Sequence, residues 1–85
     1  MARKTINQPV DVISRTQDDG QLFPMQLRWN KKQYAVAKVI KRRTAKTKDG
    51  RVEKITLSAV VWKEMVVEYH HGKRTWTLLE VESNG

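Results

Sequence analysis

Closely spaced basic residues fill the middle of this 85-residue chain. From Arg28 to Lys54 there are eleven lysines and arginines against two acidic residues, Asp49 and Glu53. The basic residues are Arg28, Lys31, Lys32, Lys38, Lys41, Arg42, Arg43, Lys46, Lys48, Arg51 and Lys54. Such side chains neutralise phosphates, and on nucleic acids this releases condensed counterions. The segment therefore predicts a polyanionic partner that these eleven residues contact.

Two aromatic residues, Trp29 and Tyr34, stand among the basic ones. Exposed aromatic rings can stack on nucleic-acid bases. Trp29, however, shares a period of two with Leu27, and Tyr34 has apolar neighbours, so we expect both rings in the core. The charge could also form a solvated face that only keeps the protein soluble. The pattern does not distinguish single from double strands, or specific from non-specific binding.

Residues suited to metal binding or catalysis are few. His70 and His71 are adjacent, the chain contains no cysteine, and Glu68 is the one carboxylate at ligand spacing, so we expect no metal site. Phosphate-binding glycine loops, nucleophile elbows and His-Glu-x-x-His motifs do not occur in the sequence. Glu64 and Glu68 would lie roughly 13 Å apart on an extended strand, too far to share a proton. The sequence predicts a non-enzymatic protein without a cofactor.

Composition and length predict one small domain. Apolar runs fall far short of the roughly 20 residues that a membrane span requires, and a basic start is not followed by the apolar segment of a signal peptide. We therefore expect a cytoplasmic protein with no membrane partner. We expect a flexible N-terminus over residues 1–8, a single β domain over 9–82 and a tail over 83–85.

Alternating apolar and polar residues predict short strands separated by turns. Turn signals occur at Asp19-Gly20, Asp49-Gly50 and His71-Gly72, and Asn30-Lys31-Lys32 is a further candidate connection. Asp49-Gly50 predicts a type I′ hairpin whose two arms, Val39–Lys46 and Arg51–Leu57, project with the basic residues on them. We expect an all-β fold, a small antiparallel barrel or strongly curved meander of five to six strands with a projecting basic hairpin.

A helix is the competing interpretation of residues 52–69. Five residues there have the helical spacing 4, 3, 4, 3: Ile55, Ala59, Trp62, Val66 and Tyr69. Several apolar residues fall off that stripe, and the β-branched valines favour strands. We favour strands and leave the helix open.

The expected core follows from the strand alternation. It comprises Val10, Val12, Phe23, Met25, Leu27, Trp29, Tyr34, Val36, Ile40, Ile55, Leu57, Val61, Met65, Val67, Tyr69, Trp76 and Leu78. Trp62 lies at a change of strand and is not assigned.

Five segments of the chain occur in a recognisable order: Pro9-Val10-Asp11-Val12, Asp19-Gly20, the run from Leu27 to Val36, Met65–Tyr69 and Trp76–Val81. Together they resemble a small bacterial domain of unknown function that accompanies Y-family (translesion) DNA polymerases. The resemblance implies a compact all-β fold and an association with DNA repair or replication, which favours DNA over RNA as partner. Where that family tends to be Trp-rich, this chain has Lys41-Arg42-Arg43-Thr44. No catalytic residue is implied.

Two functional hypotheses follow. The first is a non-enzymatic nucleic-acid-binding module whose hairpin presents Lys41, Arg42, Arg43, Lys46, Lys48 and Arg51 to phosphates, with Lys31 and Lys32 extending the surface. The second is an accessory module that docks on an acidic protein surface by charge complementarity. Either could act as a monomer or as a dimer paired through exposed strands, which the lysines would discourage.

Overall fold

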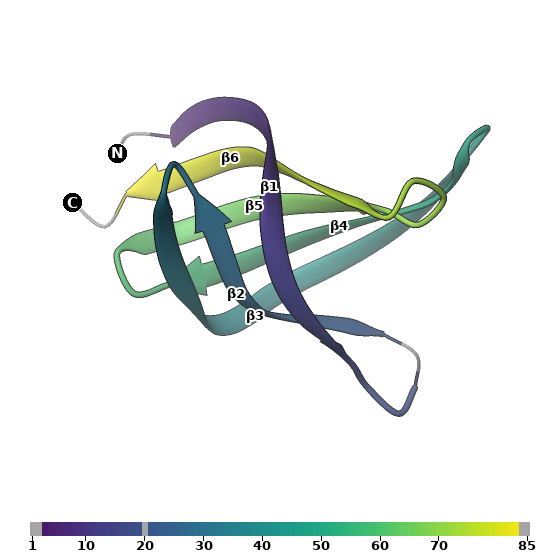
Figure 1. The fold of residues 1–85 in the computed structure, drawn as a ribbon, viewed down its shortest axis with the longest axis horizontal. Coiled ribbons are helices and arrows are strands. Elements are labelled where there is room, and N and C mark those ends of the chain that lie inside the picture. Colours follow the sequence, from purple (N-terminus) through teal and green to yellow (C-terminus); the bar gives the residue numbers. More distant parts are fainter. Residues whose placement is uncertain (1–2, 20, 84–85) are drawn as a thin grey trace.

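Six antiparallel strands form the protein, and the computed structural model describes residues 3–19 and 21–83. The strands are β1 (Arg3–Thr16), β2 (Leu22–Trp29), β3 (Lys32–Thr47), β4 (Gly50–Ala59), β5 (Trp62–His70) and β6 (Thr75–Ser83). Each strand pairs with the next along the chain, and β1 pairs with β6 to close a ring (Figure 1). The all-β antiparallel prediction is confirmed, and β4 and β5 replace the helix left open for residues 52–69.

The ring is uneven because β1 and β3 each change partners along their length. β1 pairs with β6 as far as Val10 and then with β2 from Asp11 to Thr16. β3 pairs with β2 only from Lys32 to Ala35. From Val36 to Thr47 it pairs with β4, and within residues 3–19 and 21–83 no strand pairs with its other side. In Figure 1, β2 and β3 diverge beyond their connecting turn.

Residues with positive φ mark a bulge and a tight turn. Asn7 (φ 52°) lies in the bulge of β1 between Thr5 and Gln8, and Asn tolerates this conformation better than most residues do. Asn30 and Lys31 (φ 57° and 65°) link β2 to β3. Positive φ at both linking residues defines a type I′ turn, which matches the twist of the two strands.

The core fills the space inside the ring. Its buried members are Leu27, Ile55, Leu57, Ala59, Met65, Val67, Trp76, Leu78 and Val81. Six other expected residues are partly buried against them: Val10, Val12, Trp29, Tyr34, Val36 and Tyr69. Trp62, left unassigned from the sequence, also packs there. Seven of the residues expected in the core are thus buried, all but one of them on β4, β5 and β6.

Three expected core residues are instead exposed, because bulges and a turn interrupt the alternation. The pairing of β1 with β2 skips Met25, which is 41% exposed, while its neighbour Pro24 is buried. Pro24 therefore lies at a bulge, where a missing N–H is tolerated. Ile40 occupies a bulge of β3 and is 44% exposed. Val61 lies in the connection from β4 to β5 and is 55% exposed.

The first strand extends into the N-terminal segment that is expected to be flexible. Arg3 to Thr5 pair with β6, where a flexible segment is expected from the sequence. Residues distant in the sequence hold this segment in the sheet, since Thr5 lies opposite Glu80 and Arg3 lies opposite Glu82. β6 extends to Ser83, the first residue of the expected tail. Residues 1, 2, 20, 84 and 85 lie outside the described part of the chain, and with them the Gly of the expected Asp19-Gly20 turn. Among the residues described, no helix is long and apolar enough to cross a membrane.

Candidate nucleic-acid interface

Three cations converge on the outer face of β3 and β4. Lys41 lies opposite Thr56, and Arg43 lies opposite Lys54. The four side chains line a depression of about 90 Å³. They share the outer face because their neighbour Ile55 is fully buried on the inner one. The ion pairs found in the described part of the chain include none that engages these three cations.

The arrangement of Arg43 and Lys54 is electrostatically unfavourable by itself. Like charges directly opposite on an antiparallel pair destabilise it. Both side chains are exposed, and Lys41 adds a third positive charge to the same depression. An anion bound among them would relieve this repulsion, and the hydroxyl of Thr56 could donate a further hydrogen bond to it.

Three more cations occupy the tip of the β3–β4 hairpin. β5 pairs with β4 only as far as Val52, so Lys46, Lys48 and Arg51 lie beyond the last strand pair with β5. All three are exposed. The projecting part of the hairpin is thus residues 46–51, which is shorter than the arms expected from the sequence. In Figure 1 it forms one end of the long axis of the molecule.

The turn at the tip differs from the expected type I′ form. Thr47 pairs with Gly50, so the connection is Lys48 and Asp49, and the positive φ (123°) falls on Gly50. The hydroxyl of Thr47 donates a hydrogen bond to the carbonyl of Gly50 at 2.8 Å.

The connection between β5 and β6 supports the tip. The backbone N–H of His71 donates to the carbonyl of Arg51 at 2.9 Å. A Cβ added at Gly72 would lie 2.6 Å from the carbonyl oxygen of Asp49, so only glycine permits this approach. The two connections are therefore packed together, and the cations of the tip are held on a supported hairpin.

Arg42 is less exposed than the other ten cations of the predicted set. Its guanidinium lies 3.2 Å from Glu53 Oε1, and the side chain is 15% exposed. The other oxygen of Glu53 lies 2.9 Å from Nε2 of His71, whose ring packs edge-on against Tyr69. Glu53 is buried, and two partners satisfy its oxygens. We assign Arg42 to this structural network, which joins the hairpin to the β5–β6 connection. The sequence signal for it is Glu53, one of two acids in the basic segment.

The other predicted cations lie apart from the hairpin tip. Lys31 belongs to the β2–β3 turn and Lys32 starts β3 directly after it. In Figure 1 this turn and the β3–β4 turn are at opposite ends of the molecule. Arg28 pairs with Gln33 and with Asp11 on the small sheet of β1, β2 and β3. Lys38 is exposed beside the first bulge of β3. The eleven residues therefore do not form one continuous surface.

Trp29 and Tyr34 pack partly buried against the core, as expected. Trp29 lies between Tyr34 and Trp62, with ring centroids at 6.4 and 5.8 Å, and its indole N–H donates to Gln8 Oε1 at 3.0 Å. Tyr69 packs on Trp76 at 4.7 Å. These rings stabilise the core, so the candidate interface consists of cations and a hydroxyl without a stacking platform.

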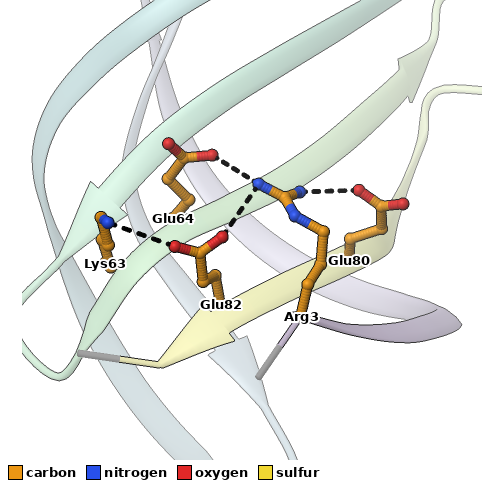
Figure 2. Close-up of polar contacts among 5 residues, drawn as sticks. All are labelled: Arg3, Lys63, Glu64, Glu80 and Glu82. Atoms are coloured by element: carbon orange, nitrogen blue, oxygen red, sulfur yellow. Dashed lines mark hydrogen bonds and ion pairs between the residues drawn. The ribbon is translucent and has the colours of Figure 1, made fainter. Parts of the chain in front are cut away.

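Three carboxylates and two cations lie together on β1, β5 and β6 (Figure 2). Arg3 lies 2.8 Å from Glu64 and from Glu80, and 3.3 Å from Glu82. Lys63 reaches the second oxygen of Glu82 at 3.4 Å. Hydrogen bonds to Glu80 and then to Glu64 raise the pKa of the Arg3 guanidinium above its ordinary value. The sheet is thus cationic on β3 and β4 and carboxylate-rich on β5 and β6.

The two adjacent histidines contact different carboxylates. Nε2 of His70 is 2.9 Å from Glu68, whereas His71 contacts Glu53. No group of three potential metal ligands occurs within the ranges that the structure describes.

Comparison of the chain with family models, curated proteins and solved structures finds no match. The resemblance to the polymerase-associated domain stays a prediction.

Proposed function

We propose that this chain is a non-enzymatic nucleic-acid-binding module that contacts phosphates. The observation that carries the proposal is the depression on β3 and β4, where Lys41, Arg43 and Lys54 converge without acidic partners among the described residues. The hairpin tip supplies Lys46, Lys48 and Arg51 as further contacts. Because the aromatic rings pack inside, binding depends on charge and is insensitive to base sequence.

The proposed partner is DNA, in line with the resemblance to a domain that accompanies DNA polymerases. Duplex DNA carries two phosphates per base pair, a higher linear charge density than a single strand. An interface of cations without stacking rings therefore favours the duplex, whereas single-strand binders combine cations with exposed aromatic residues.

The test is fluorescence anisotropy of labelled duplex DNA, single-stranded DNA and RNA of equal length across a salt series. We expect tightest binding to the duplex and a log–log salt slope of about −0.9 per phosphate contacted. Replacing Arg43 and Lys54 together by Ala should make that slope shallower by about 0.9 for each of the two lost contacts. The change should be the same for every sequence tested. No binding at low salt would contradict the proposal.

A matched control comes from the other end of the molecule. Replacing Lys31 and Lys32 together by Ala removes the same formal charge from the β2–β3 turn. We expect a smaller loss of affinity in this variant than in the variant lacking Arg43 and Lys54. Equal losses would mean that only net charge matters and would contradict the assignment of the interface.

The alternative function, docking on an acidic protein partner, is favoured by a different observation, the unpaired side of β3. It would explain a failure to bind any oligonucleotide.

A further inference from the structure

Most of β3 has one side available for pairing. β2 leaves β3 after Ala35, and among residues 3–19 and 21–83 no other strand replaces it along Val36–Thr47. Two bulges, next to Val36 and Val39, distort the first part of this edge. From Lys41 to Thr47 the register with β4 is regular. A regular, exposed edge is a template for an additional strand.

The geometry of the hairpin identifies the groups that face the free side. Thr47 and Gly50 flank the two-residue connection, so they form a hydrogen-bonded pair of the ladder. Pairs alternate along antiparallel strands, so every second residue directs its N–H and C=O away from the partner. On β3 these residues are Arg42, Thr44 and Lys46.

The charge of this edge selects what can pair with it. β3 contains no acidic residue, and Lys41, Arg43 and Lys46 are exposed along the regular part. Two copies of the edge would repel each other, which is how lysines protect exposed edges from self-association. An extended segment with acidic residues at alternate positions would place them on the outer face, next to Lys41 and Arg43.

We propose that Lys41–Thr47 of β3 binds an extended acidic segment of a partner protein as an added strand. Main-chain hydrogen bonds to Arg42, Thr44 and Lys46 supply affinity, and alternate carboxylates supply selectivity. The proposal does not depend on nucleic-acid binding, because the main-chain edge of β3 supplies the affinity. The carboxylates of the added strand would share only Lys41 and Arg43 with the cluster around Lys54.

The first test uses a labelled heptapeptide of alternating Glu and Thr, capped at both ends, and the full chain. We expect binding in the micromolar range and slower amide hydrogen exchange at Arg42, Thr44 and Lys46. The control is the same peptide with every second main-chain nitrogen methylated on the pairing side, which keeps the charge but blocks the ladder. The methylated peptide should bind at least tenfold more weakly. Equal binding of both peptides, or no binding of either at low salt, would overturn the proposal.

The second test changes the protein. Thr44→Pro removes one N–H from the free side, a change that edge strands tolerate, and Thr44→Val keeps the main chain intact. We expect tenfold weaker peptide binding for the Pro variant and unchanged binding for the Val variant, with DNA binding of both unaltered. Peptide affinity equal to that of the parent in a folded Thr44→Pro variant would refute strand addition. If that variant does not fold, the methylated peptide decides the question.

Discussion

Arg43 and Lys54 face each other directly across β3 and β4, on the outer surface of the sheet. Two cations in such a position repel each other, and the described residues supply no carboxylate that pairs with either. We expect this repulsion to lower the stability of the isolated protein, and the proposed anion would relieve it. Stability and binding therefore make opposite demands on these positions.

Replacing Lys54 by Thr should raise stability and weaken binding. The substitution removes the repulsion with Arg43 and introduces a residue that favours strands. We expect the free energy of unfolding in urea to rise by about 0.2–1 kcal/mol at low salt, with the gain shrinking as salt screens the charges. Affinity for duplex DNA should fall at the same time. A variant that loses both stability and affinity would show that Lys54 supports the fold.

The pairing of Arg42 with Glu53 should contribute measurably to stability. Because Glu53 is buried, removing Arg42 leaves a carboxylate with one partner fewer, and we expect Arg42→Ala to cost about 1–3 kcal/mol. Glu53→Gln should cost a similar amount. A double-mutant cycle should give a coupling of about 0.5–3 kcal/mol. Glu68→Gln serves as a control, because Glu68 contacts His70 in a less buried pair. If Arg42→Ala and Glu53→Gln lose no more stability than this control, the network does not support the fold.

The type I′ turn between β2 and β3 should be improved by glycine. Lys31 has a φ of 65°, which disfavours residues with a Cβ. Asn-Gly is the preferred sequence for this turn, so Lys31→Gly should stabilise the protein by about 0.5–1 kcal/mol after the entropy of glycine is included. Lys32→Gly, one residue later within β3, should destabilise by a similar amount. Chemical denaturation of both variants measures the difference. A loss of stability in Lys31→Gly would show that Asn30 and Lys31 do not form a type I′ turn.

Leu27 and Met25 should respond very differently to truncation, although both follow the same alternation. Leu27 is fully buried, so Leu27→Ala should cost about 2–5 kcal/mol. Met25→Ala should change stability by less than about 0.5 kcal/mol because its side chain is largely in solvent. Thermal and urea unfolding of the two variants compares them. Similar losses of stability in the two variants would mean that Met25 is not exposed at a bulge.

The bulges explain which parts of the fold the sequence could predict. Strands follow from local patterns, and β4, β5 and β6 confirm that residues 52–69 and the C-terminal segment form strands. The alternation around Met25 and Ile40 misled the core prediction because each is an extra residue in a strand pair. Where an extra residue is accommodated depends on the neighbouring strand, so the local pattern could not reveal it.

The candidate site shows the same limit. Arg42 and Arg43 are adjacent and chemically alike, so composition assigned both to phosphate binding. The bulge next to Val39 resets the alternation of β3, which turns Arg42 toward Glu53 and leaves Arg43 outside. Only the pairing of β3 with β4 decides which of the two is available. Likewise, the separation of Lys31 and Lys32 from the tip depends on the direction of β3 in space.

The ring closes between its first and last strands, and this has a kinetic consequence. Arg3 contacts Glu80 across 77 positions of sequence, so the β1–β6 pairing requires the most costly loop closure of the fold. Such non-local contacts slow folding. We expect the four-stranded segment from β3 to β6 to form early and the β1–β6 seam to close last. A circularly permuted chain, with a peptide linker joining β6 to β1 and new ends in the β4–β5 connection, would convert that seam into a local hairpin and should fold faster.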